Sequence, residues 1–67
     1  MKTEVTINIY KESGKWYDEV KFTSSISCVD SDLLKEEAKT KFSSLKSNSY
    51  TIEAWTGDMM YKALIIQ

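Results

Sequence analysis

Few residues in this chain have side chains that could do chemistry, and the single cysteine is the first of them. Cys28 is the only cysteine of the 67 residues, and the chain has no histidine. A reactive thiolate needs a basic or positively charged neighbour, whereas Asp30 and Asp32 bring negative charge. One cysteine without histidine forms neither an intramolecular disulfide nor a Cys/His zinc site. We predict that Cys28 is a small buried or half-buried filler.

Asp30-Ser31-Asp32 is the second candidate, because neighbouring carboxylates can bind Ca²⁺. The other ligands and the glycine of a calcium-binding loop do not follow it. Both carboxylates fit a helix start instead, with Asp30 as the N-cap and Asp32 in the first turn, where negative charge suits the helix dipole. The sequence has no glycine-rich phosphate loop and no pair of titratable groups arranged for acid–base catalysis. We therefore predict no metal, no cofactor and no enzymatic activity.

Aromatic residues and lysines remain, and their chemistry is binding by contact. Aromatic and Met side chains are enriched at the centre of protein interfaces, and aromatic rings beside lysines can stack on nucleic-acid bases. Either function requires these side chains to share one face of a sheet. The strands that position them therefore decide the prediction.

The segment before residue 29 predicts one β-hairpin. Val5, Ile7 and Ile9 alternate with polar residues, which is the period of a half-buried strand, and Ser13-Gly14 predicts a two-residue turn. Strict antiparallel pairing then gives the pairs Lys11 with Trp16, Tyr10 with Tyr17, Ile9 with Asp18, Asn8 with Glu19, Ile7 with Val20, Thr6 with Lys21 and Val5 with Phe22. Only Asp18 falls on the apolar face, which indicates a frayed or bulged edge near the turn.

A single helix is predicted between Val29 and Asn48. Asp30 is its N-cap, Val29 and Leu34 are spaced for a hydrophobic staple, and Asn48 is a left-handed stop. One narrow apolar stripe follows from the spacing of Leu34, Ala38, Phe42 and Leu45. We expect this stripe to pack against the sheet.

The segment after the helix predicts a second hairpin. Its apolar residues alternate with more polar ones, and Gly57-Asp58 predicts a two-residue turn. The implied pairs are Trp55 with Met60, Ala54 with Tyr61, Glu53 with Lys62, Ile52 with Ala63, Thr51 with Leu64 and Tyr50 with Ile65. With both registers, the sheet face away from the helix carries Tyr10, Tyr17, Trp55, Met60 and Leu64, flanked by charged residues that include Lys21 and Lys62.

These elements predict one α+β domain over residues 1–67 with the order ββαββ. Two sheets fit this order, one with the first and last strands parallel in the centre and one in sequence order. The least charged strands, Val5–Ile9 and Ala63–Ile66, should be central, so we predict a mixed four-stranded sheet of order 2-1-4-3 with the helix across one face. This element order resembles the β-grasp architecture of the small immunoglobulin-binding domains of bacterial surface proteins. The resemblance concerns topology and implies no binding residues.

The opening hairpin resembles a second group of proteins. Ile9-Tyr10-Lys11-Glu12-Ser13-Gly14-Lys15-Trp16-Tyr17 looks like the start of small uncharacterised proteins encoded by phages and other mobile elements of bacteria. The resemblance covers this segment alone and implies a small cytoplasmic accessory factor without naming an activity. A cytoplasmic location also fits a lone thiol, the lack of an apolar signal region after Met1, and an apolar run at Ala63–Ile66 too short to span a bilayer.

Charge separates the possible functions. All nine basic residues are lysines and the net charge is −1, so arginine forks that read bases are missing and strong sequence-specific nucleic-acid binding is not expected. We predict an interaction module that binds a protein partner or itself through an edge strand or through Tyr10, Tyr17, Trp55, Met60 and Leu64. The alternative is weak single-stranded nucleic-acid binding through Tyr10, Tyr17, Lys21, Trp55 and Lys62. Two further interpretations stay open: these side chains only pair across strands, or the chain is one repeat of a larger homo-oligomer. No membrane or small-molecule partner is expected.

Overall fold

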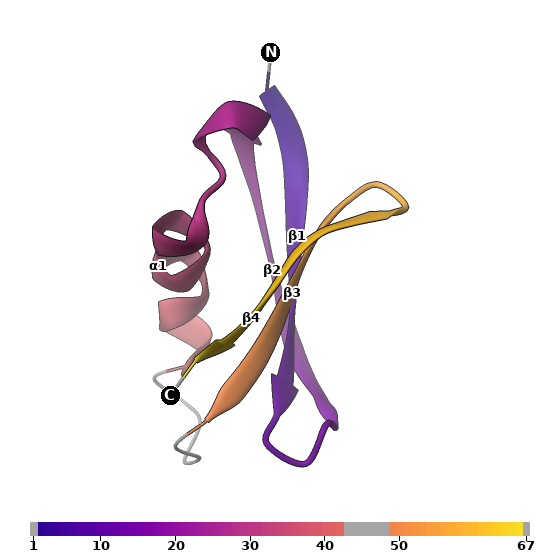
Figure 1. Ribbon diagram of the computed structural model, residues 1–67, viewed down its shortest axis with the longest axis vertical. Helices are drawn as coiled ribbons and strands as arrows, with labels where there is room; N and C mark the ends of the chain where they lie inside the picture. The colour runs from indigo at the N-terminus through magenta and orange to yellow at the C-terminus, as the bar shows by residue number, and fades with distance from the viewer. Residues whose placement is uncertain (1, 43–48, 67) are drawn as a thin grey trace.

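The computed structural model describes residues 2–42 and 49–66. The chain order is two strands, a short 3-10 helix, one α-helix and two more strands (Figure 1). These elements are β1 (Lys2–Lys11), β2 (Trp16–Ser25), η1 (Ile26–Cys28), α1 (Ser31–Phe42), β3 (Tyr50–Thr56) and β4 (Met59–Ile66). The coarse prediction of an α+β fold with ββαββ order is therefore confirmed.

The four strands form one sheet in the order β2-β1-β3-β4. Each neighbouring pair in it is antiparallel. The predicted order 2-1-4-3 with a parallel central pair is wrong, and so is the prediction of a mixed sheet. The β-grasp resemblance rested on element order and does not extend to this strand order.

The central position of β3 has a simple physical reason. Its inward residues Tyr50, Ile52 and Ala54 are buried, with Ile52 and Ala54 fully covered. Its one charged residue, Glu53, points to the other face of the sheet, so it does not prevent burial of the strand. The low charge of β4 predicted a central strand, but β4 is an edge strand whose apolar residues are largely exposed.

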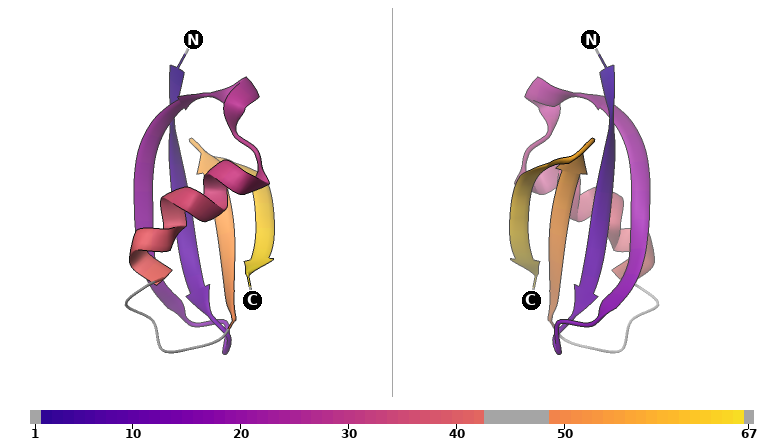
Figure 2. Two further views of the ribbon diagram at one scale, coloured as in Figure 1. Left: turned by 90° about the vertical axis from the view of Figure 1, so that its left-hand side faces the viewer. Right: turned by 90° about the vertical axis from the view of Figure 1, so that its right-hand side faces the viewer.

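Helix α1 covers one face of this sheet and leaves the other face open. Figure 2 shows α1 crossing the strands diagonally in the left view and the four strands unobstructed in the right view. The core lies between them and consists of Val5, Ile7, Ile9, Val29, Leu34, Ala38, Ile52 and Ala54. Full burial of a Val, Leu or Ile side chain stabilises the fold by about 1.5–3 kcal/mol. This layer therefore holds the helix on the sheet.

The start of α1 agrees with the prediction. The Leu33 backbone N–H donates to Asp30 Oδ1 at 2.9 Å, which is the N-cap bond. Val29 and Leu34 are both buried in the core, as a hydrophobic staple requires. Helix α1 is described to Phe42, whereas the predictions for Leu45 and Asn48, and for the side chain of Phe42, lie outside what the structure describes.

The first hairpin reaches the predicted register by a different turn. Gly14 N donates to Lys11 O at 2.7 Å and Lys11 N to Lys15 O at 2.8 Å, so the turn has three residues, Glu12 to Gly14, rather than two. Gly14 has φ +84°, which a residue without Cβ adopts easily. Tyr10 then pairs with Trp16, and a bulge at Tyr17 restores the pairing of Ile9 with Asp18 and all pairs beyond it.

The second hairpin keeps the predicted turn and loses the predicted register. Thr56 pairs with Met59 across Gly57-Asp58, and Trp55 pairs with Met60 as expected. Only Gly57 of this turn has positive φ, +62°, which fits a type II′ turn. A bulge at Tyr61 then shifts every later pair by one residue, to Ala54 with Lys62, Glu53 with Ala63, Ile52 with Leu64, Thr51 with Ile65 and Tyr50 with Ile66.

Candidate interaction surface

The sheet face opposite α1, called the uncovered face below, is defined by strand alternation and pairing. Residues that pair directly point to the same side of a sheet, and the buried residues of β1 and β3 mark the helix side. The uncovered face therefore carries Lys2, Glu4, Thr6, Asn8 and Tyr10 of β1, Thr51, Glu53 and Trp55 of β3, Trp16, Glu19, Lys21, Thr23 and Ser25 of β2 and Met60, Ala63 and Ile65 of β4.

Glu53 organises the centre of this face. Its carboxylate Oε1 accepts a hydrogen bond from Trp55 Nε1 at 3.3 Å, and it is also hydrogen-bonded to the side chain of Tyr10 on the neighbouring strand. Partial burial, this hydrogen bond and the negative charge of Glu53 raise the pKa of the Tyr10 hydroxyl above 10.0. The phenol therefore stays neutral as a donor, and one carboxylate fixes two aromatic rings at the seam between the hairpins.

A shallow hollow adjoins this arrangement. It has a volume of about 330 Å³ and lies between the β1–β2 turn and β3. Its lining residues are Tyr10, Lys11, Glu12, Gly14, Thr51 and Glu53. A cation and two carboxylates at its rim make it suited to a polar group of a partner rather than to an apolar side chain.

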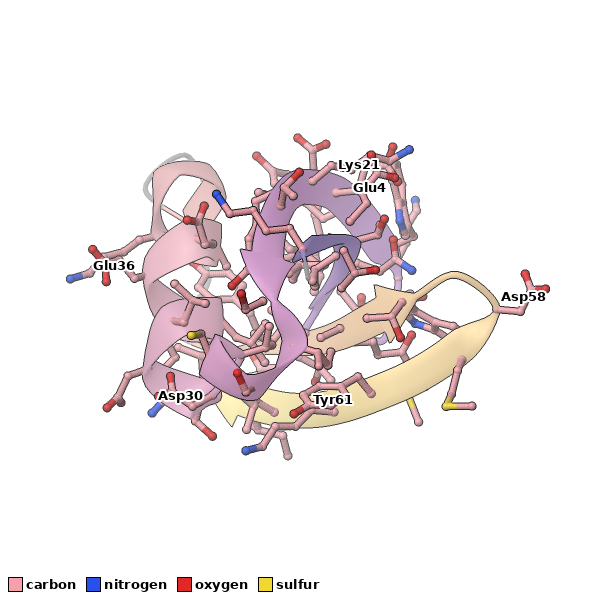
Figure 3. All side chains as sticks on the ribbon, turned by 90° about the horizontal axis from the view of Figure 1, so that it is seen from above. Glu4, Lys21, Asp30, Glu36, Asp58 and Tyr61 are labelled. Atoms are coloured by element: carbon pink, nitrogen blue, oxygen red, sulfur yellow. The ribbon has the colours of Figure 1, made fainter. Side chains whose placement is uncertain are left out.

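Strand β4 contains four of the six exposed large hydrophobic residues in the described part of the chain. Among the described residues, the large hydrophobic side chains that are exposed include Met59 (71%), Met60 (49%), Tyr61 (43%) and Ile65 (68%), all in this one strand. The others are Trp16 in β2 and Ile26 in η1. Figure 3 shows the β3–β4 turn, marked by Asp58, extending away from the side of the molecule where α1 and Glu36 lie.

A second hollow lies on the helix side, where the end of β4 approaches α1 (Figure 1). Its volume is about 530 Å³. One apolar side chain, Ile66, forms part of its wall, and the helix contributes charged residues of both signs: Asp32, Lys35, Glu36 and Lys39. This hollow therefore combines an apolar strand end with acidic and basic groups.

Three of the five residues predicted for partner binding lie on the uncovered face, and two do not. Tyr10, Trp55 and Met60 are placed there as predicted. Tyr17 packs against the core because it is the extra residue of its bulge. Leu64 also packs against the core, because the bulge at Tyr61 reverses the faces of the residues that follow it. Placing Tyr17 and Leu64 on the uncovered face was wrong.

The set predicted for nucleic-acid binding is divided in the same way. Tyr10, Trp55 and Lys21 lie on the uncovered face. Lys62 pairs with the buried Ala54 and so points to the helix side, and the predicted Glu53–Lys62 pair is wrong. With Tyr17 also on the helix side, the predicted platform loses one of its rings and one of its lysines. The exposed Trp16, which was not predicted for this face, pairs with Tyr10 and lies on it.

Ile65, Met59 and Tyr61 are exposed residues that sequence reasoning missed. Strict alternation paired Ile65 with the inward Tyr50, whereas the structure pairs it with Thr51 on the uncovered face. The apolar residues on both sides of Lys62 in β4 were the available signal, because consecutive apolar residues in a strand place apolar side chains on both faces. The sequence alone cannot separate burial on two faces from exposure at an edge.

The remaining candidates have structural roles or are exposed. Cys28 is exposed, so its prediction as a buried or half-buried filler is wrong; it lies in η1, which contributes no buried residue. Asp30 caps α1. Within the described part of the chain, no group of three or more His, Cys, Asp or Glu residues is placed to hold a metal ion. No helix described there has both the length and the apolar character needed to cross a membrane.

Comparisons of this chain with protein families, with curated proteins and with solved structures found no match.

Proposed function

We propose that this chain is a non-enzymatic interaction module that binds a protein partner through β4 and the adjoining part of the uncovered face. The single observation that carries the proposal is the concentration of exposed apolar side chains in one edge strand, from Met59 to Ile65. An unpaired strand edge offers backbone donors and acceptors to another strand, and exposed apolar side chains beside it add contact area.

The middle of the uncovered face supports the same function because two of its aromatic rings are hydrogen-bonded to Glu53. Glu53 holds Trp55 by a hydrogen bond of 3.3 Å and holds Tyr10 across the β1–β3 seam. Aromatic rings that are already fixed lose little conformational freedom when a partner covers them. A partner seated on β4 can therefore extend its contact over Trp55 at low entropic cost.

Nucleic-acid binding remains the alternative, with weaker support. Lys21 is the one lysine of its predicted set on the uncovered face, together with Tyr10 and Trp55. The carboxylates of Glu4, Glu19 and Glu53 share that face, and they repel phosphate. The exposed side chains of β4 are aliphatic or thioether for the most part, which favours a protein surface over stacked bases.

Site-specific photocrosslinking tests the proposal. A photoreactive phenylalanine analogue replaces Ile65 on β4 or, as the matched control, Thr23 on β2 at the opposite edge; both side chains are exposed on the uncovered face. After illumination in the native host, we expect protein adducts at position 65 in clear excess over position 23. Equal adducts at the two positions, or none at position 65 in a folded chain, would overturn the proposal, and adducts to nucleic acid alone would favour the alternative.

A further inference from the structure

The two edges of the sheet differ in how they discourage strand pairing. Strand β2 has Asp18, Glu19 and Lys21 along its length, and charges on an edge strand are a common defence against pairing with another chain. Strand β4 has Lys62 as its one charged residue. Its exposed residues lie on both sides of that lysine, so β4 is the edge at which another strand can add.

From this edge we infer that the partner is a second copy of this chain, whose β4 pairs antiparallel with the first β4 about a two-fold axis. The inference rests on the proposed function and names the partner for it. An isologous contact of this kind uses the same strand twice and closes after two copies. With the axis perpendicular to the sheet, the two sheets become one of eight strands, and both α1 helices lie on the same face.

The bulge at Tyr61 limits the possible registers. Regular alternation in β4 runs from Lys62 to Ile66, and the two-fold axis requires each pair to join residues of the same face. Centring the contact on Lys62 places two ammonium groups directly opposite each other, which is unfavourable. Centring it on Ala63 brings the bulge at Tyr61 into the ladder. Centring it on Leu64 uses the whole regular segment and avoids both problems.

The register centred on Leu64 makes three kinds of pair. Leu64 meets the partner's Leu64 on the helix side, and exposed Ile65 meets the partner's Ala63 on the uncovered face. Lys62 meets the partner's Ile66, again on the helix side. The apolar residues of β4 therefore cover one another, and the one lysine of each strand faces the apolar end of the other.

Charge complementarity supports this register. Ile66 lines the hollow of about 530 Å³ together with Asp32 and Glu36 of α1. A lysine directly opposite Ile66 extends along the wall of this hollow toward those carboxylates. Lys35 and Lys39 also line it, so the four lining charges balance, and the contact depends on the added ammonium group lying nearer to Asp32 and Glu36 than to these two lysines. The two-fold axis repeats the contact, giving two identical networks in each dimer.

Charge reversal tests the second copy and its register together. We expect the wild-type chain to dimerise reversibly in sedimentation over a range of concentrations, because five paired residues bury less than the roughly 800 Å² per partner of a standard interface. Lys62→Glu and Glu36→Lys each place like charges together and should weaken dimerisation by roughly tenfold or more. The matched control Lys21→Glu, at the other edge, should dimerise like the wild type.

Mixing the two weakened variants distinguishes contacts between copies from contacts within one chain. In a mixed dimer of Lys62→Glu with Glu36→Lys, the two reversed residues face each other with opposite charges at one network, and the other network keeps the wild-type pair. We therefore expect association close to that of the wild type. Failure of the mixture to associate, while the wild type dimerises, would overturn the register. A wild-type chain that stays monomeric would overturn the inference that the partner is a second copy. If adducts of another protein then form at position 65, the proposed function still holds.

Discussion

The two hairpins contain the same kind of irregularity and differ in its consequence. Each has one extra residue on its edge strand, Tyr17 in β2 and Tyr61 in β4. In the first hairpin, the three-residue turn closed by Gly14 removes one position and the bulge at Tyr17 adds it back. In the second, the two-residue turn leaves the bulge at Tyr61 uncompensated.

This difference decides which side chains a partner can reach. Because alternation has a period of two, one uncompensated residue moves each later side chain to the opposite face. Leu64 and Ile66 consequently pack toward the core, and Ile65 becomes 68% exposed. The turn and the bulge must therefore be counted together before a face is assigned to any residue beyond them.

The largest expected effect on stability distinguishes two neighbouring residues of β4, and it tests whether the bulge at Tyr61 is uncompensated. Leu64→Lys places a charge against the core and should lower the free energy of unfolding by about 2–3 kcal/mol. Ile65→Lys, one position along and on the uncovered face, should change it by less than about 0.5 kcal/mol. Urea denaturation of both variants, at a concentration where the wild type is monomeric, measures the difference. A larger loss of stability for Ile65→Lys than for Leu64→Lys would show that β4 follows the strict register without a bulge at Tyr61.

Deleting each bulge residue tests how much that residue contributes to stability. Removal of Tyr17 takes away a ring that packs against the core and whose centroid lies 5.6 Å from Lys11 Nζ, and it should lower the free energy of unfolding by about 2 kcal/mol. Removal of Tyr61, which is exposed, should cost about 1 kcal/mol or less.

Both deletions should leave the remaining pairs intact, because each bulge residue lacks a direct partner in its ladder. Cross-strand nuclear Overhauser effects between Ile52 and Leu64 report the register of the second hairpin. Their loss when Tyr61 is deleted would show that the bulge is not located there.

The smallest effect concerns the seam that joins the hairpins. The pKa of Tyr10 is raised by its partial burial and by Glu53, so the unfolded chain releases this proton first as the pH rises. The stability associated with the neutral phenol is complete below pH 10.0 and is lost as the pH rises through the folded pKa. The Tyr10→Phe variant has no phenol proton to release. The excess stability of the wild type over this variant should therefore shrink above that pH.

Denaturant unfolding of both proteins from about pH 8 to about pH 11 measures this advantage. The same comparison in a Glu53→Gln background is the control, because it removes the charge that opposes ionisation. The alkaline decline should be smaller there. An equal decline in both backgrounds would mean that Glu53 does not act on Tyr10.

Local signals allowed much of the fold to be predicted. The Asp30 cap, the Val29–Leu34 staple, the Gly57-Asp58 turn and the pairing of Val5, Ile7 and Ile9 with β2 depend on residues close in sequence, and all of them are present. Trp55 and Met60 were also placed correctly, because they lie between the turn and the bulge.

The strand order and half of the second hairpin depend on information that the sequence does not display. Counting charges per strand ignored the face on which each charge lies, so Glu53 made β3 look like an edge and the uncharged run Ala63–Ile66 made β4 look central. A bulge at a tyrosine has no compositional mark, unlike a left-handed turn at Gly14. The wrong face was predicted for Leu64 because the bulge at Tyr61 was not detected.

The antiparallel seam between β1 and β3 also determines how this chain folds. Each hairpin joins neighbouring segments and can form within about 1–10 μs, but the seam joins residues 39 to 49 positions apart in the sequence, from Lys11 with Tyr50 to Thr6 with Trp55. Closing that long loop costs entropy before the contacts that reward it exist. We therefore expect the rate-limiting barrier to lie at the docking of two preformed hairpins, with α1 contained in the loop that closes.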